Sequence, residues 1–182
     1  MRHVAYVFLL SSLMALGMAC GTVSDEPPGS ADPRVRADAN PVELEGSKVV
    51  LAGMTVNVEI ADNWETRGRG LSGRTRLGPN EGMIFLYPRA DMRSFWMKGC
   101  LIGLDILFLD DDGRVLNIAS LDPPEDEEIE DSIPSADSMA PSRMVLELRK
   151  GWCEEHGVKP GERVRLSKTV RGRLQALRRK SS

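Results

Sequence analysis

The chain has 182 residues and a formal net charge of −3, with 24 basic against 27 acidic residues. Removal of residues 1–20 would take away one basic residue and leave 23 basic against 27 acidic, a net charge of −4. This mild acidic balance argues against general nucleic-acid binding, so no nucleic-acid partner is expected.

The N-terminus has the features of a secretory signal peptide. Arg2 precedes an apolar run from Val4 to Met18, which ends in small residues next to Cys20. At about fifteen residues, the run is shorter than the roughly 20 that a spanning helix needs, and polar residues follow it. We therefore predict that residues 1–20 are cleaved rather than membrane-spanning, and that the protein is exported to the periplasm or cell envelope.

Cys20 stands where the acylated cysteine of a bacterial lipoprotein would stand. The segment from Gly17 to Cys20 matches that pattern only in part, because Gly17 takes the place of the usual leucine. Two outcomes remain open: lipidation of Cys20, which would anchor the protein to a membrane, or ordinary cleavage nearby. Residues 21–43 are rich in Asp, Pro, Ser and Ala without apolar periodicity, which predicts a disordered tether.

Residues 44–168 have the size of one domain with a single core. Met54 to Ile60 alternates apolar and polar residues, which predicts a half-buried strand. Asp62 followed by Glu65 predicts the cap of a short helix, which Gly68 and Gly70 would end.

The rest of the domain consists of short apolar runs separated by Gly, Pro or Asp clusters, and Asp111-Asp112-Gly113 is a hairpin signal. A second short helix is expected from Trp152 to Gly157. Short strands with little helix predict an all-β fold, a small β-barrel or sandwich with one or two short helices. The further strands are expected at residues 83–86, 94–98, 104–110, 115–120, 143–149 and 163–166.

Two charged segments lie outside this pattern. Residues 122–131 hold seven carboxylates but no glycine turn, so a solvated loop is expected rather than a calcium site. The basic tail, residues 169–182, holds five basic residues between Arg171 and Lys180. This tail could form a helix, and it is either a frayed solvated end or a segment that contacts acidic lipid headgroups or the acidic loop.

Asp105 is the most unusual polar residue, because it alternates with apolar residues on the strand from residue 104. A buried, unpaired charge there would cost several kcal/mol, so a cation or several donors must meet it. Arg67, Arg69, Arg74 and Lys98 are the available cations. Asp105 is therefore either a structural ion pair or a carboxylate that acts on a ligand.

The segment from Phe95 to Lys98 divides into two faces. Phe95 and Met97 are wholly apolar and are expected in the core, which leaves Trp96 and Lys98 facing a rim or groove. An indole there could stack on a sugar or another planar group, although a tryptophan is more often packed than functional.

Glu147 alternates with leucines on a later strand and could form a second carboxylate opposite Asp105. Paired carboxylates perform acid and base chemistry in glycoside hydrolysis. The chain shows no nucleophile elbow, Ser/His/Asp set, phosphate-binding glycine loop or zinc signature, so no cofactor or metal is predicted and binding is favoured over turnover. The candidate polar cluster comprises Arg67, Arg74, Trp96, Lys98, Asp105 and Glu147.

Cys100 and Cys153 are the two thiols of the domain. Export would place them where disulfides persist, so a bridge between them is considered, provided that their Cα atoms lie within roughly 7 Å. Neither belongs to a C-x-x-C motif, and His156 is the only histidine nearby, which argues against a metal site.

Several uncommon blocks occur in one order along the chain. They resemble the DUF192 family, also called UPF0127, over about residues 48–168. The resemblance implies a compact, mainly β domain that is exported or membrane-anchored, and it brings no catalytic residues. Ser72 and the pair Gly99-Cys100 depart from the family's usual residues at those positions. The blocks are residues 60–62, 67–74, 81–85, 95–98, 104–108 and 145–151.

Three functions remain open at this stage. The first is an envelope-tethered, non-catalytic domain that binds a small polar ligand, a glycan or an envelope protein through the polar cluster. The second is a carbohydrate hydrolase or lyase that uses Asp105 and Glu147. In the third, the cluster is purely structural, and function lies in the acidic loop or the basic tail.

Overall fold

The structure, a computed structural model, describes residues 46–125 and 132–180. The predicted signal peptide, Cys20, the tether and residues 126–131 of the acidic loop lie outside the described residues. Within these ranges the chain forms nine strands and three helices: β1 (Gly46–Leu51), β2 (Met54–Ala61), α1 (Trp64–Arg69), β3 (Glu81–Asp91), β4 (Ser94–Trp96), β5 (Leu104–Leu109), β6 (Val115–Leu121), β7 (Ser135–Asp137), β8 (Ser142–Arg149), α2 (Trp152–Glu155), β9 (Arg165–Leu166) and α3 (Lys168–Lys180).

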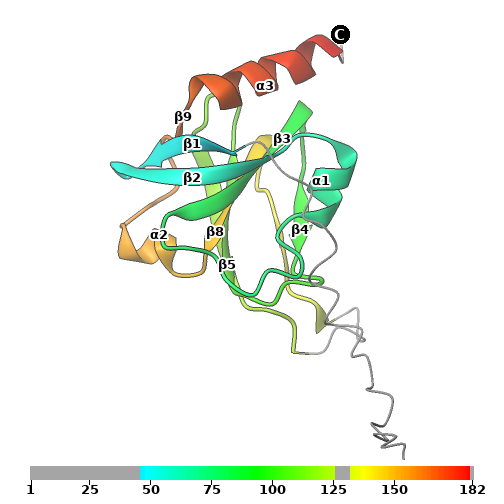
Figure 1. Cartoon of the computed structure of the whole chain (residues 1–182), viewed down its shortest axis with the longest axis vertical. Coiled ribbons are helices and arrows are strands. Elements are labelled where there is room, and N and C mark those ends of the chain that lie inside the picture. Colours follow the sequence, from blue (N-terminus) through cyan, green and yellow to red (C-terminus); the bar gives the residue numbers. More distant parts are fainter. Residues whose placement is uncertain (1–45, 126–131, 181–182) are drawn as a thin grey trace, which may run out of the picture. The chain divides into compact units, whose positions relative to one another are not determined.

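Seven strands form one curled sheet in the order β6-β5-β8-β3-β2-β1-β9, and β4 pairs with β7 in a separate ribbon (Figure 1). The neighbours β2 and β3 run parallel, joined by the crossover that contains α1, and the other pairs are antiparallel. The expected all-β class is confirmed.

The sheet is a half-barrel and not a closed barrel. Its edge strands β6 and β9 approach each other only where they begin, at an isolated bridge between Arg114 and Arg163. Val115 N–H donates to the Glu162 carbonyl at 2.8 Å, and Val164 N–H donates to the Gly113 carbonyl at 2.8 Å. The two residues of β9 are too few to continue this pairing along β6.

Both faces of the central strands are buried, because successive side chains on a strand point to opposite faces. We call one the α3 face, since Val170 and Leu174 of α3 pack there with Ile84 and Leu146. We call the other the α1 face, since the segment that follows α1 covers it. The buried residues of the α1 face are Ala61, Leu71, Met83, Phe85, Met97, Cys100, Leu104, Ile106, Phe108, Ile133 and Val145.

Helix α1 begins one residue later than the sequence pattern suggests. Asn63, not Asp62, is the N-cap: its backbone is extended, and its side chain accepts from Thr66 N–H at 2.9 Å. Thr66 Oγ1 in turn accepts from Asn63 N–H, which completes a capping box typically worth about 1 kcal/mol. Asp62 instead lies 3.5 Å from Arg173 of α3.

The strand predictions from residue 54 onward are confirmed with shifted ends, whereas the sequence pattern missed β1 and β7. The basic tail is helical from Lys168 to Lys180, and Val170 and Leu174 are buried against the sheet. A frayed end is therefore the wrong description of residues 168–180. None of the helices in the described ranges is both long and apolar enough to cross a membrane.

Candidate functional site

The Asp105 carboxylate lies at the N-terminus of α2. Its side chain is fully buried on the α3 face and accepts from Cys153 N–H at 2.8 Å and Gly151 N–H at 3.2 Å. Ser120 Oγ donates a third hydrogen bond at 2.6 Å. The sequence led us to expect either a cation or several donors at this carboxylate, and the structure shows several donors: two N–H groups at the N-terminus of a short helix and one hydroxyl.

Glu147 lies on the opposite face of the same sheet. In the register, Asp105 stands beside Leu148 of β8, whereas Ile106 stands beside Glu147. Directly paired residues share a face and adjacent residues on one strand do not, so the two carboxylates point to opposite faces. They share no cleft, and an acid and base pair made of Asp105 and Glu147 is not available.

The Glu147 carboxyl is buried in apolar surroundings. Its neighbours in register are Met83 of β3 and Ile106 of β5, both fully buried. Glu147 is 6% exposed, and its Oε2 has no hydrogen-bond partner among the described residues. Burial raises the pKa of Glu147 to about 8, because the charged form loses its hydration.

Glu147 lines a cavity of about 240 Å³ on the α1 face, which we call the Glu147 cavity. Such a carboxyl is a candidate functional group, since buried polar atoms without partners are rare in native proteins. The lining residues come from α1, the segment after it, β3, β4, the loop after β4, and β8. They are Arg67, Gly68, Arg69, Gly70, Leu71, Ser72, Phe85, Tyr87, Ser94, Phe95, Trp96, Lys98, Cys100 and Glu147.

Aromatic rings form much of the wall. Phe85 and Phe95 meet edge to face with centroids 5.0 Å apart, and Phe108 stands behind Phe95 at 5.9 Å. Edge-to-face contacts of this kind hold rings in fixed orientations. The wall therefore offers a preformed apolar surface to a ligand.

Two guanidinium groups lie within cation–π distance of the Tyr87 ring. Arg93 lies 3.8 Å and Arg67 5.0 Å from its ring centroid. Burial is the main reason that the pKa of Tyr87 is raised, and burial likewise lowers the pKa of Arg67. Arg67 Nη1 also donates to the Leu86 carbonyl at 2.9 Å, so this arginine is held in place at the cavity.

Trp96 and Lys98 lie where the alternation of residues 94–98 predicted them. Met97 is fully buried, whereas Trp96 is 54% exposed and Lys98 is exposed. Lys98 Nζ lies 4.9 Å from the Trp96 ring centroid, within the range of a cation–π contact. Both residues line the Glu147 cavity, so the structure brings four of the six cluster residues together: Arg67, Trp96, Lys98 and Glu147.

The loop after β4 is docked on the segment that follows α1. Gly73 N–H donates to the Gly99 carbonyl at 2.7 Å, and Ser72 Oγ donates to the Lys98 carbonyl at 3.2 Å. Gly99 has φ +72°, and a Cβ there would lie 2.1 Å from Ser72 Oγ. Ser72 and Gly99, two positions that depart from the family's usual residues, are thus in contact.

We expect Gly99→Ala to destabilise the protein by about 1–3 kcal/mol, because it adds left-handed backbone strain to the clash with Ser72. Urea unfolding measures this change. In the Ser72→Ala background the clashing oxygen is absent, so the same substitution should cost only the backbone part. Equal costs in both backgrounds would show that Ser72 does not restrict Gly99.

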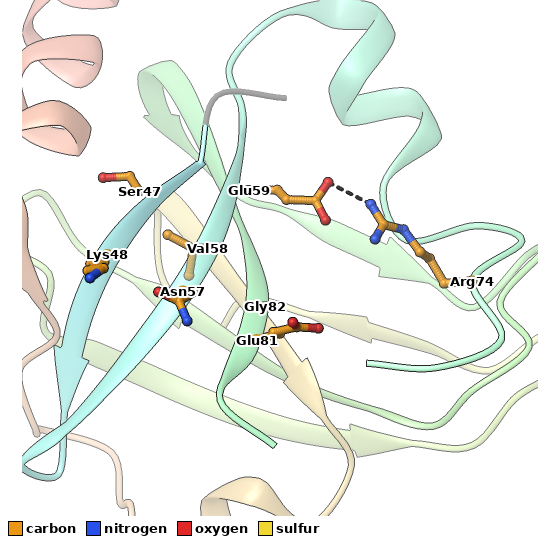
Figure 2. A pocket seen from close by; sticks show the side chains of 8 residues that line it. All are labelled: Ser47, Lys48, Asn57, Val58, Glu59, Arg74, Glu81 and Gly82. Carbon is orange, nitrogen blue, oxygen red and sulfur yellow. Dashed lines mark hydrogen bonds and ion pairs between the residues drawn. The ribbon is translucent and has the colours of Figure 1, made fainter. Parts of the chain in front are cut away.

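Arg74 lies outside the Glu147 cavity. Its Nη2 pairs with Glu59 Oε2 at 2.6 Å, beside a separate groove of about 340 Å³ over β1, β2 and β3 (Figure 2). Glu81, the other carboxylate of this groove, accepts from Gly78 N–H at 2.9 Å. Because both carboxylates already have partners, the groove is the weaker candidate for a site.

We expect Arg74→Ala to change the free energy of unfolding by less than about 1 kcal/mol, since the arginine and its partner are both partly exposed to water. Chemical denaturation at low and high salt tests this. A loss of several kcal/mol would mean that the pair anchors the segment after α1.

The two cysteines lie on different faces of the sheet. Cys100 packs on the α1 face and Cys153 on the α3 face, both as buried thiols. The considered disulfide is therefore wrong, because β8 and its neighbours separate the two side chains. Burial, followed by the nearby Asp105 charge, raises the pKa of the Cys153 thiol well above its usual range.

Across the described residues, no cluster of His, Cys, Asp and Glu has the arrangement of a metal site.

The sequence pattern missed Phe85, Tyr87 and Arg69 as cavity residues. Phe85 and Tyr87 lie on a strand whose alternation was readable, but both faces of β3 are buried, so periodicity could not separate a wall residue from core. The aromatic pair Phe85 and Tyr87, two residues apart on one strand, was the available signal.

Comparison with known proteins gives two solved structures and one family model that match this chain. Two solved structures each have a TM-score of 0.61 to this chain. The first is a "putative transcription regulator" from Sinorhizobium meliloti 1021, which is 32% identical in sequence; the match covers 69% of this chain and 96% of that one. The second is a protein of unknown function from Novosphingobium aromaticivorans DSM 12444, which is 36% identical; the match covers 70% of this chain and 94% of that one. No curated protein matches. The family model of DUF192, described as "Uncharacterized ACR, COG1430", matches residues 48–166. The chain belongs to the DUF192 family.

Proposed function

We propose that this protein is an exported, envelope-tethered domain that binds a small polar ligand in the Glu147 cavity without chemical turnover. The observation that carries the proposal is the unpartnered Oε2 of Glu147 within an aromatic-walled cavity. A buried carboxyl without a partner is costly to folding, and a ligand that hydrogen-bonds it would recover part of that cost.

Binding is favoured over glycoside hydrolysis by the arrangement of the carboxylates. The paired mechanism needs two carboxyl groups on either side of one bond. Asp105 instead hydrogen-bonds the start of α2, on the other face of the sheet. Glu147 therefore has no carboxylate partner in the cavity, where the remaining charged residues are Arg67, Arg69 and Lys98.

A thermal-shift screen of the protein tests the binding proposal, with monosaccharides, amino acids, hydroxy acids and aromatic acids as probes. A ligand present at 100 times its Kd stabilises by about 2.7 kcal/mol, which corresponds to several degrees in Tm. We expect at least one probe class to raise the Tm of the wild type but not that of Glu147→Leu. Leucine suits the apolar neighbours Met83 and Ile106, so this variant should fold.

Arg74→Ala is the matched control, because it alters the neighbouring groove and leaves the cavity intact. Its Tm shifts should equal those of the wild type. The proposal fails if no probe raises the Tm of the wild type. It also fails if Glu147→Leu and Trp96→Ala show the same Tm shifts as the wild type.

The envelope location rests on the pattern of residues 1–20, and metabolic labelling with radioactive palmitate tests it. We expect a labelled, membrane-associated product that loses its label in Cys20→Ala. An unlabelled product released in soluble form by osmotic shock would support export without an anchor, and retention of the full chain in the cytoplasm would overturn export.

The name of the Sinorhizobium meliloti structure suggests a competing function, DNA binding. The chain offers six basic residues and no acidic ones on α3, although its net charge is −3. We expect no complex with random-sequence duplex DNA in a mobility-shift assay at physiological salt, since general binding needs a positive surface that dominates its surroundings. A salt-dependent complex would favour the DNA-binding alternative.

A further inference from the structure

We infer that the ligand of the Glu147 cavity is a small single-ring organic anion. Its carboxylate lies near Lys98 and Arg67, and the opposite end of the ligand carries an oxygen that accepts a hydrogen bond from Glu147. This inference rests on the proposed function and names the ligand's chemistry. It follows from the charges of the cavity lining, from the buried Glu147 carboxyl, and from the walls and volume of the cavity, taken in turn.

The charges of the lining favour an anion. Among the described residues that line the cavity, Glu147 is the only acidic one, against three basic residues. Arg69 lies 3.6 Å from Glu65, but both side chains are largely exposed and this pair neutralises little. Lys98 forms no ion pair with any acid in the described ranges, and its ammonium lies 4.9 Å from the centroid of the Trp96 ring. A carboxylate at the rim would therefore gain attraction from Lys98 and Arg67.

The inner end of the cavity favours an acceptor. Glu147 stands between Met83 and Ile106, and no cation contacts its carboxyl in the described structure. In such surroundings the group is protonated at neutral pH, so it carries an O–H donor. A hydroxyl or carbonyl oxygen on the ligand would accept from it. A ligand ammonium placed there would meet the repulsion of the surrounding basic residues.

The walls and volume favour a single ring. About 240 Å³ is below the roughly 300–1,000 Å³ of pockets for drug-sized ligands. Phe85 and Phe95 present apolar ring surfaces, and Trp96 stands beside them as a further planar face. Arg93 and Arg67 already lie 3.8 Å and 5.0 Å from the Tyr87 ring centroid, so less of this ring is left to stack on a ligand.

Isothermal titration with matched probes tests the inference. The anions are 4-hydroxybenzoate and D-glucuronate, which distinguish an aromatic from a sugar ring; their neutral counterparts are 4-hydroxybenzamide and D-glucose. We expect at least one anion to bind at least tenfold more tightly than its neutral counterpart, the usual size of a charge-assisted contact. Lys98→Met should remove most of this preference, whereas Lys48→Met, the same change in the groove of Figure 2, should preserve it.

The pH dependence provides a second readout. The titratable groups that line the cavity with Glu147 are Tyr87 of β3, Arg67 and Arg69 of α1, and Lys98 and Cys100 after β4. Arg143 and Arg149 lie on the same face of β8 as Glu147. Above about pH 8 Glu147 loses its donor and becomes negative, so anion affinity should fall at least tenfold between pH 6 and pH 9. In Glu147→Gln the amide remains a donor, and affinity should vary less with pH.

Three outcomes separate this inference from the proposed function. Tighter binding of the neutral probes, or an affinity that rises with pH, overturns the anion assignment. A cation or neutral ligand that binds in a Glu147-dependent way leaves the proposed function standing and overturns the inference. Absence of binding by these probes and by every class in the thermal-shift screen overturns both.

Discussion

Raising the pH from 5 to 9 should reduce the free energy of unfolding of the wild-type protein by about 4 kcal/mol more than that of Glu147→Gln. The pKa of Glu147 is raised from 4.5 to about 8 in the folded protein. Between these values the native state holds a proton that the unfolded state has lost, so stability falls as pH rises, by about 1.4 kcal/mol per unit. The full contribution is present below pH 4.5 and is lost above about pH 8.

Urea unfolding at a series of pH values measures the difference between the two proteins. Taking the difference removes the contributions of the other ionisable groups that both proteins share. At pH 9 the glutamine variant should be the more stable of the two, since it carries no buried charge. Glu154→Gln, which removes an exposed carboxylate from α2, serves as the control and should follow the wild type.

If the difference in free energy of unfolding between the two proteins does not change from pH 5 to pH 9, a cation or a hydrogen-bond donor must contact the Glu147 carboxyl in the dissolved protein. In that case the buried oxygen would no longer distinguish the cavity. The expected result also bears on function, because a destabilising group retained in a core is typical of a residue held for binding.

Asp105→Asn should destabilise the protein by about 2–4 kcal/mol. The carboxylate accepts from Ser120 and from two backbone N–H groups at the start of α2, all in a fully buried place. The NH₂ group of the asparagine side chain is a donor and would face at least one of these donors, so buried N–H or O–H groups would be left without an acceptor. Urea unfolding measures the loss, and Ser120→Ala should cost only about 1 kcal/mol because it removes one partner.

The reactivity of Cys153 reports whether the loss arises at α2. In a background that carries Cys20→Ala and Cys100→Ala, a thiol reagent should modify Cys153 faster in Asp105→Asn than in the parent, because the Cys153 N–H bond to Asp105 holds the helix against the sheet. Unchanged stability and unchanged thiol reactivity together would contradict a structural role for Asp105 and return it to consideration as a ligand-binding group.

The main strands and the division of residues 94–98 followed from local pattern. Met54 to Ile60 alternates because one side of β2 is solvated over much of its length, and Phe95 and Met97 differ from Trp96 and Lys98 in polarity. The short strands β1 and β7 escaped prediction, since each depends on a partner distant in the chain. The one-residue shift of the α1 cap is likewise a choice between two adjacent Asx residues that propensity does not separate.

The sequence by itself determined the mainly β class, the family, and four residues of the candidate site, Arg67, Trp96, Lys98 and Glu147. It could not decide what those residues do. Asp105 and Glu147 have similar local patterns, a carboxylate between apolar residues on a strand. Only the register of β5 against β8 places them on opposite faces, where Asp105 meets the donors of α2 and Glu147 meets none. Burial and hydrogen-bond partners are properties of the packed sheet, and for that reason the tertiary structure alone separates the structural carboxylate from the candidate functional one.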